Sequence, residues 1–161
     1  IKQSRLYLLK KNNMCGIFGI ISDNEIVKKE LKILIQHAEQ RGKDSSGVFF
    51  FKNKKYFIQR ESCEISQLIK KNNINSNKFI MGHSRLVTNG LLDNQPIFRN
   101  SICVIHNGIV VNDNEIWKDI NKNRKHDIDT EIIAAIVEED LENEIPVNEI
   151  HKNIFKKCKG M

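Results

Sequence analysis

Five short segments of the sequence each hold a residue that is chemically reactive or that tolerates an unusual backbone. In chain order they are Met14-Cys-Gly16, Arg41-Gly-Lys-Asp-Ser-Ser-Gly47, Gly82-His-Ser-Arg-Leu-Val-Thr-Asn-Gly90, His106-Asn-Gly108 and Asp129-Thr-Glu131. Together they supply a thiol, guanidinium groups, a side-chain amide and a carboxylate. A thiol of this kind can attack a carbonyl carbon, and the charged groups can bind a charged substrate.

Cys15 is the candidate nucleophile, because it directly follows Met14. A free thiol has a pKa near ~8.5 and needs a base close by. The α-amino group of the same residue, with a pKa near ~8, can serve only if Cys15 is residue one. Removal of an initiating Met14, which occurs before a small residue, would expose that amine. The alternative is a buried cysteine on an apolar strand.

Taken together and in this order, the five segments resemble the class II glutamine amidotransferases, whose glutaminase domains begin Met-Cys-Gly-Ile. The resemblance extends from Met14 to about Ala135. It implies an α+β fold of the amino-terminal-nucleophile hydrolases, a four-layer αββα sandwich of two antiparallel sheets. It also implies hydrolysis of L-glutamine to glutamate and ammonia through a cysteine thioester, with no metal and no organic cofactor.

The resemblance assigns the oxyanion hole to Asn107 and Gly108. A side-chain amide and an unhindered backbone N–H at these positions suit the negative charge of a tetrahedral intermediate. The Asn-Gly pair also predicts a hairpin turn between strands at 102–105 and 109–111. Turn and oxyanion donor are compatible roles. His106 is then expected to be a packed, hydrogen-bonded histidine.

Free glutamine carries a carboxylate and an ammonium, and the resemblance gives their recognition to Arg85 and Asp129. A surface ion pair for Arg85 and a helix N-cap for Asp129 are the alternatives. Thr88 matches a further position that contacts the substrate. Arg41 and Gly42 match a loop that shapes the surroundings of the nucleophile, and a plain helix end at Gly42 remains open.

The ammonia acceptor is expected to be a synthase domain or subunit. Gly-His-x-Arg followed by Thr-x-Gly is more similar to glucosamine-6-phosphate synthase and amidophosphoribosyltransferase than to asparagine synthetase, and Gln95-Pro96 leans towards the second. We expect an amino-sugar type of acceptor. Leu86 stands where sugar-phosphate members have tryptophan, so the lid over bound glutamine is expected to differ.

Apolar periodicity predicts the elements that must position these residues. Strands are expected at 15–21, 47–51, 56–59, 79–83 and 101–106. Helices are expected at 27–38 with Gly42 as the cap after it, at 115–121, at 130–139 behind an Asp129 cap, and at 147–158. Strand pairs followed by grouped helices favour a layered α+β domain.

Residues 1–13 are expected to lie outside the fold, as a cleavable propeptide or as sequence upstream of the true start. Residues 14–161 form the expected glutaminase domain, which stops before the last strands of such a fold. If residues 1–13 stay attached, the alternative is a catalytically silent module that binds glutamine.

Composition limits the remaining possibilities. At 161 residues with 40% apolar content, one domain is expected. The net charge of +6 comes from lysines scattered among asparagines, which favours a solvated surface over a nucleic-acid site. No apolar run reaches membrane-spanning length, so a cytoplasmic location is expected. Four separated cysteines predict neither disulfides nor a zinc site, and most are expected to be buried.

Overall fold

Four strands with alternating or continuous apolar residues form one antiparallel sheet. The computed structural model describes residues 15–72, 74, 78–86 and 94–160. The strands are β1 (Gly16–Ile21), β2 (Ser45–Lys52), β3 (Lys55–Glu61) and β4 (Phe79–Arg85), in the order β1-β4-β2-β3. Both faces of β2 are covered by other elements, which is why its run Val48-Phe-Phe-Phe51 is apolar without alternation.

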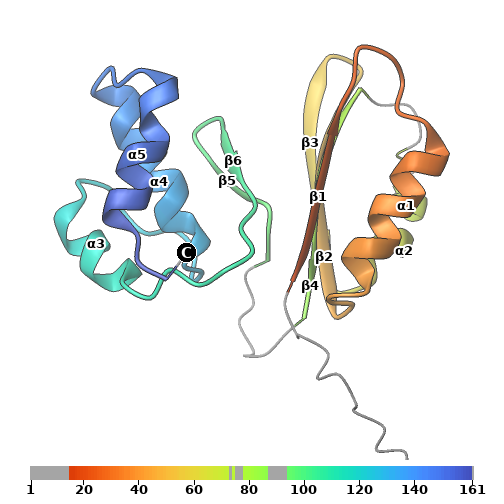
Figure 1. The fold of residues 1–161 in the computed structure, drawn as a ribbon, viewed down its shortest axis with the longest axis horizontal. Coiled ribbons are helices and arrows are strands. Elements are labelled where there is room, and N and C mark those ends of the chain that lie inside the picture. The colour runs from red at the N-terminus through yellow and green to blue at the C-terminus, as the bar shows by residue number, and fades with distance from the viewer. Residues whose placement is uncertain (1–14, 73, 75–77, 87–93, 161) are drawn as a thin grey trace, which may run out of the picture.

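Two helices, α1 (Lys28–Glu39) and α2 (Ile65–Lys71), cover one face of this sheet (Figure 1). The core beneath them consists of apolar side chains that lie on this face of the strands and on the inner sides of both helices. Its members include Phe18, Leu31, Ile35, Val48, Phe50, Leu68 and Ile80.

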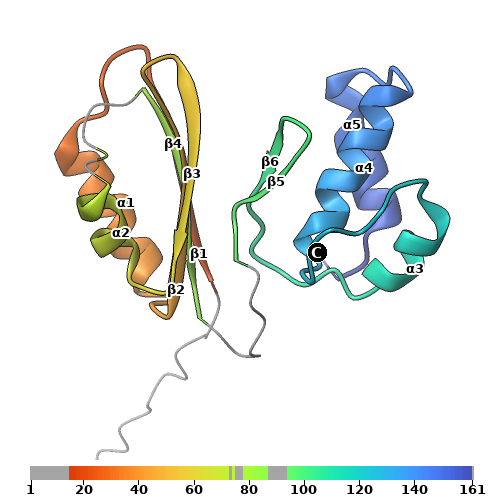
Figure 2. The same cartoon turned by 180° about the vertical axis from the view of Figure 1, so that it is seen from behind.

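The opposite face of the sheet looks towards a second, two-stranded antiparallel sheet of β5 (Ile97–Arg99) and β6 (Ile102–Val104). Asn100 and Ser101 form the turn between them, with φ of 41° and 66°. Behind this hairpin lie α4 (Thr130–Glu142) and α5 (Val147–Lys157), with α3 (Asp113–Asp119) beside them (Figure 2). The layers therefore follow the predicted order αββα.

A second core, separate from the first, joins the hairpin to its helices. It contains Val110, Ile116, Ile120, Ile132, Ile136 and Cys158. Arg99 leaves β5 and is buried against α4, where its guanidinium pairs with Glu131 at 2.8 Å and with Glu138. The carboxylate of Glu131 also accepts hydrogen bonds from the backbone N–H groups of Lys125 and His126.

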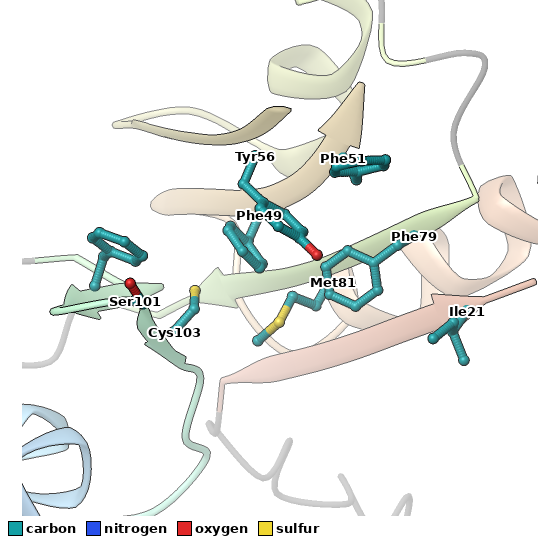
Figure 3. Close-up of a pocket in the computed structure, with 9 residues that line it drawn as sticks. Ile21, Phe49, Phe51, Tyr56, Phe79, Met81, Ser101 and Cys103 are labelled. Carbon is teal, nitrogen blue, oxygen red and sulfur yellow. The ribbon is translucent and has the colours of Figure 1, made fainter. Parts of the chain in front are cut away.

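An apolar cavity of about 600 Å³ lies between the two sheets. Figure 3 shows aromatic side chains from β2, β3 and β4 pointing into it across from Ser101 and Cys103. Its lining residues come from both the larger sheet and the β5–β6 hairpin.

Several predicted elements differ from those observed. The helix α2 and the strand β5 were not predicted. Gly42 does not cap α1, which ends at Glu39 with Gln40 as its C-cap in right-handed conformation. Asn107 and Gly108 do not form a hairpin turn, because residues 109–111 form no strand and β6 pairs with β5 through the turn at Asn100.

The cysteines were expected to be mostly buried, yet Cys15, Cys63 and Cys103 are only half-buried and Cys158 alone is buried; all four are free thiols. Within the described ranges, every helix is too short or too polar to cross a membrane.

Candidate active site

Cys15 lies immediately before β1 and is half-buried. Side chains of a strand alternate between faces, and β1 pairs with β4 so that Ile17 lies opposite His83. Continuing this alternation places Cys15 and Arg85 on the same face as His83. Gly47, which pairs with His83 from β2, shows which face this is, since it packs against Gln95 just before β5. The candidate nucleophile and Arg85 thus share the face that looks towards the second sheet.

The loop after α1 holds the start of β1 against the end of β4. The Arg41 Nε donates a hydrogen bond to the carbonyl oxygen of Cys15 at 3.0 Å. The Gly42 carbonyl accepts from the Ser84 hydroxyl at 2.6 Å. A Cβ atom at Gly42 would lie 2.4 Å from the Arg85 carbonyl carbon, so only glycine permits this approach. The loop thereby brings Arg41 and Gly42 against Cys15 and the end of β4 at Arg85.

The segment that contains Asn107 and Gly108 follows β6 and is exposed. Gly108 packs on the ring of His106, because a Cβ atom there would lie 2.7 Å from His106 Nε2. Just beyond it, the Val110 N–H donates to Asp129 Oδ2 at 2.7 Å. Asp129 Oδ1 accepts from the Thr130 N–H at 2.9 Å, so Asp129 is the N-cap of α4 as predicted. Asp129 therefore joins this segment to the start of a buried helix.

Gln95 connects these two groups of residues, and the sequence pattern gave it no such role. Its Oε1 accepts from the His106 N–H at 2.6 Å, and its Nε2 donates to the Thr130 hydroxyl at 3.0 Å. Its backbone carbonyl lies so close to Gly47 that a Cβ atom there would approach to 1.9 Å. Gln95 thus contacts the sheet of Cys15 on one side and the Asn107 segment on the other. Only its position before Pro96 distinguished it in the sequence.

Two neutral imidazoles lie in the same region. Burial, with smaller effects from the charges of Arg85 and His106, lowers the pKa of His83 to about 4. Burial also lowers the pKa of His106, and the charge of Asp129 partly opposes this. Neither ring nitrogen of His83 has a hydrogen-bond partner among the residues that the structure describes. Both histidines are therefore uncharged near pH 7.

The site thus combines a half-buried thiol, two guanidinium groups, a carboxylate with two oxygens already held by backbone N–H groups, and a glycine-containing segment after a strand. Thr88 lies outside the described residues. In the part of the chain that is described, no group of three or more ligating side chains could hold a metal ion. The arrangement suits nucleophilic attack on a substrate that carries both charges.

Comparison with known proteins identifies the family. The profile described as "Glutamine amidotransferase domain" matches residues 83–161, which include Arg85, Asn107, Gly108 and Asp129. The chain carries a class II glutamine amidotransferase domain. The matched residues include most of the third of the five segments and all of the fourth and fifth, together with the end of β4, the β5–β6 hairpin and the helices α3, α4 and α5.

Curated relatives of this amidotransferase domain include two archaeal proteins named glutamine–fructose-6-phosphate aminotransferase (isomerizing). The one from Sulfolobus acidocaldarius is 30% identical over 163 residues, which cover 91% of this chain and 27% of the relative. The one from Pyrococcus horikoshii is 34% identical over 142 residues, covering 80% and 23%. The chain therefore spans about a quarter of the length of these relatives.

Solved structures give the same fold. Glutamine phosphoribosylpyrophosphate amidotransferase from B. subtilis superposes with a TM-score of 0.66 at 22% identity, over 91% of this chain and 33% of its own. A structure described as the allosteric regulatory enzyme of purine biosynthesis gives a TM-score of 0.67, also at 22% identity, over 91% and 34%. At this identity the likeness concerns the fold, which is that of the predicted sandwich.

Proposed function

We propose that this domain hydrolyses L-glutamine to glutamate and ammonia, with Cys15 as an amino-terminal nucleophile. The observation that carries the proposal is the placement of Cys15 beside Arg85 on the inner face of the larger sheet, the face that packs against Gln95. Gln95 in turn holds the segment of Asn107 and, through Thr130, the helix start at Asp129.

In the proposed reaction, the Cys15 thiol gives its proton to the α-amine of the same residue and its sulfur attacks the side-chain amide carbon of glutamine. Asn107 and Gly108 stabilise the resulting oxyanion. The amine then passes the proton to the departing ammonia as the C–N bond breaks, leaving a thioester. Water then adds to the thioester carbonyl, the C–S bond breaks as a proton from that water passes to the sulfur, and glutamate is released while the Cys15 thiol is restored.

Arg85 and Asp129 are proposed to hold the charged end of glutamine, with Thr88 as a further contact. Asp129 can do this while capping α4, because each carboxylate oxygen accepts one backbone hydrogen bond and retains a second lone pair. Arg41 is proposed to fix the position of Cys15 through its carbonyl oxygen, which leaves the thiol and amine unencumbered.

The mechanism requires a free amine at Cys15, so we propose that residues 1–13 are absent from the active form, that the domain comprises 14–161, and that removal of Met14 then exposes the amine. The two archaeal relatives carry the name of a fructose-6-phosphate aminotransferase. We accordingly propose that the ammonia is passed to a synthase domain or subunit that aminates a sugar phosphate.

The proposal is tested by comparing the full 161-residue chain with a version that begins at Met14. Intact mass establishes whether Cys15 has become the first residue, and glutamate release measures hydrolysis. We expect hydrolysis, and labelling by a glutamine-like electrophile, in the second version alone. Glutamine binding without hydrolysis when Cys15 is residue one would favour the silent binding module instead.

Substitution then separates Cys15 from the other thiols. Cys15→Ala should abolish both hydrolysis and labelling. Cys63→Ala is the matched control, because Cys63 is also free and half-buried but follows β3. Full activity of Cys15→Ala, or equal losses in the two variants, would contradict the assignment.

The oxyanion role is tested by Asn107→Ala. Loss of one oxyanion donor should lower kcat by roughly 100-fold and leave KM for glutamine nearly unchanged. Because Asn107 is exposed, the free energy of unfolding should change little. A change confined to KM would show that Asn107 does not contact the developing charge.

A further inference from the structure

Gln95 is a buried polar side chain whose amide is used at both ends. Only 6% of its surface is exposed. Its Oε1 accepts from the His106 N–H, and its Nε2 donates to the hydroxyl of Thr130, which is itself fully buried. A buried amide with both ends paired is held in one orientation, because any rotation would leave buried polar groups unsatisfied.

The two partners of Gln95 adjoin two residues of the proposed mechanism. His106 directly precedes Asn107, and Thr130 directly follows Asp129. Asp129 makes a second connection, because its carboxylate accepts hydrogen bonds from the N–H groups of Val110 and Thr130. The segment 106–110 is thus tied to the start of α4 at both of its ends, by Gln95 at the first and by Asp129 at the second.

The backbone of Gln95 connects the 106–110 segment and the start of α4 to the larger sheet. Its carbonyl packs directly on Gly47 of β2, and its N–H donates to the side chain of Asn94, which in turn donates to the carbonyl of Ser46. The adjacent residue Ser45 pairs with Arg85. Gln95 therefore contacts β2 within two residues of Ser45, which pairs with Arg85 at the end of β4. Arg85 is the proposed glutamine-binding cation.

We propose that Gln95 is a positioning residue that sets the location of the oxyanion segment relative to Cys15. The inference rests on the proposed function, and it assigns Gln95 no contact with substrate. Oxyanion donors act only when they are aimed at the developing charge, and an error of a fraction of an ångström lowers their contribution. We call the two side-chain hydrogen bonds of Gln95, to His106 and Thr130, the clamp. Loss of the clamp should therefore destabilise the transition state more than it weakens glutamine binding.

The test compares Gln95→Ala with Asn112→Ala in the version that begins at Met14. Asn112 is a matched control, because it is 8% exposed and its amide likewise accepts from one backbone N–H, of Lys159, and donates to one carbonyl, of Lys157. Both variants should lose stability. Gln95→Ala alone should lower kcat, by about tenfold or more, with KM changing less than about threefold.

Gln95→Glu keeps an oxygen that can accept from the His106 N–H. The Thr130 hydroxyl can rotate to donate to the second oxygen, so both contacts are retained without the amide N–H. We expect this variant to recover most of the kcat lost in Gln95→Ala. Equal kcat values for Gln95→Ala and Asn112→Ala, or failure of Gln95→Glu to exceed Gln95→Ala, would overturn the proposal.

A second measurement does not depend on activity. Amide hydrogen exchange in the full chain reports the clamp directly, since the His106 N–H is its donor. Gln95→Ala should speed exchange at His106 by about tenfold or more relative to Asn112→Ala. Unchanged exchange would overturn the clamp. Absence of hydrolysis in the unsubstituted domain with accelerated exchange at His106 would instead overturn the proposed function and leave the clamp as a purely structural contact.

Discussion

His83 should make the stability of this domain depend on pH, because its imidazole is fully buried and has no hydrogen-bond partner among the described residues. Burial lowers its pKa from 6.5 to about 4. As pH falls through this range, the unfolded chain takes up a proton that the folded protein refuses. The contribution of His83 to the free energy of unfolding is therefore constant above about pH 6.5, decreases between about pH 6.5 and 4, and levels off below.

The size of the effect follows from the same two values. Each pH unit between them costs about 1.4 kcal/mol of unfolding free energy. At pH 5.0, which is 1.5 units below 6.5, His83 should cost about 2 kcal/mol relative to pH 7.5. His106 acts in the same direction, because burial lowers its pKa too. The contribution of His83 must therefore be measured as a difference between variants.

The measurement is urea denaturation of the full chain at pH 7.5 and pH 5.0, followed by circular dichroism. His83→Leu should lose about 2 kcal/mol less than the unsubstituted chain between the two pH values. His83→Gln, which is also non-titrating, should show the same smaller difference whatever its absolute stability. His151→Gln, on the exposed side of α5, controls for the removal of a histidine.

The result that refutes this reasoning is an unchanged pH dependence in both His83 variants. It would mean that the buried ring is protonated in the folded state without cost. The unpartnered nitrogens of His83 would then have to find an acceptor in the folded protein.

Three further predictions concern the contacts around the site. Glu131→Gln should lower the free energy of unfolding by about 3 kcal/mol in denaturant titrations, since it leaves the buried Arg99 without one of its carboxylates; a loss below about 1 kcal/mol would show that the pair is dispensable. Gly47→Ala should destabilise the domain by about 1–3 kcal/mol and lower kcat, because the new Cβ would displace Gln95, whereas Gly19→Ala, with no atom closer than 3.8 Å, should be the milder change. Arg85→Lys should raise KM for glutamine about tenfold with kcat largely kept, because an ammonium cannot reproduce a two-point contact with a carboxylate; an unchanged KM would place Arg85 outside the glutamine site.

The sequence predicted those elements whose own residues determine them. The helix α4 begins at Thr130, where the carboxylate of Asp129 accepts a hydrogen bond from the Thr130 N–H. Such a cap depends only on the residue before the helix, so the local sequence is enough to predict it. The run at β2 is apolar enough to be a strand in any context. In contrast, α2 has only seven residues, and β5 has three residues after a proline. Such short elements depend on tertiary packing, which local patterns do not encode.

Two glycines, Gly42 and Gly108, have structural roles that differ from the predicted ones. Gly42 resembles a helix cap in the sequence, but its small size serves the approach of its loop to Arg85. The Asn107-Gly108 pair has the composition of a tight hairpin turn, yet the turn lies at Asn100 and Ser101, where both residues adopt positive φ. In both cases the residue type was informative and the interaction that requires it was long-range.

The sequence indicated the candidate site residues other than Gln95, but it did not show how they are arranged in space. The strand register that places Cys15 and Arg85 on one face follows from the pairing of β1 with β4, which are separated by more than fifty residues. The contacts of Gln95 span eleven and thirty-five residues. No periodic pattern reports on hydrogen bonds of that range, so this residue became visible only in the folded protein.

The two hydrophobic cores have no residue in common. One binds the larger sheet to α1 and α2, and the other binds the hairpin to α4 and its neighbours. The proposed catalytic groups are divided between these halves, with the thiol on one and the oxyanion segment on the other. The distance between the thiol and the oxyanion segment therefore depends on the contacts between the halves, such as those of Gln95, and on neither core by itself.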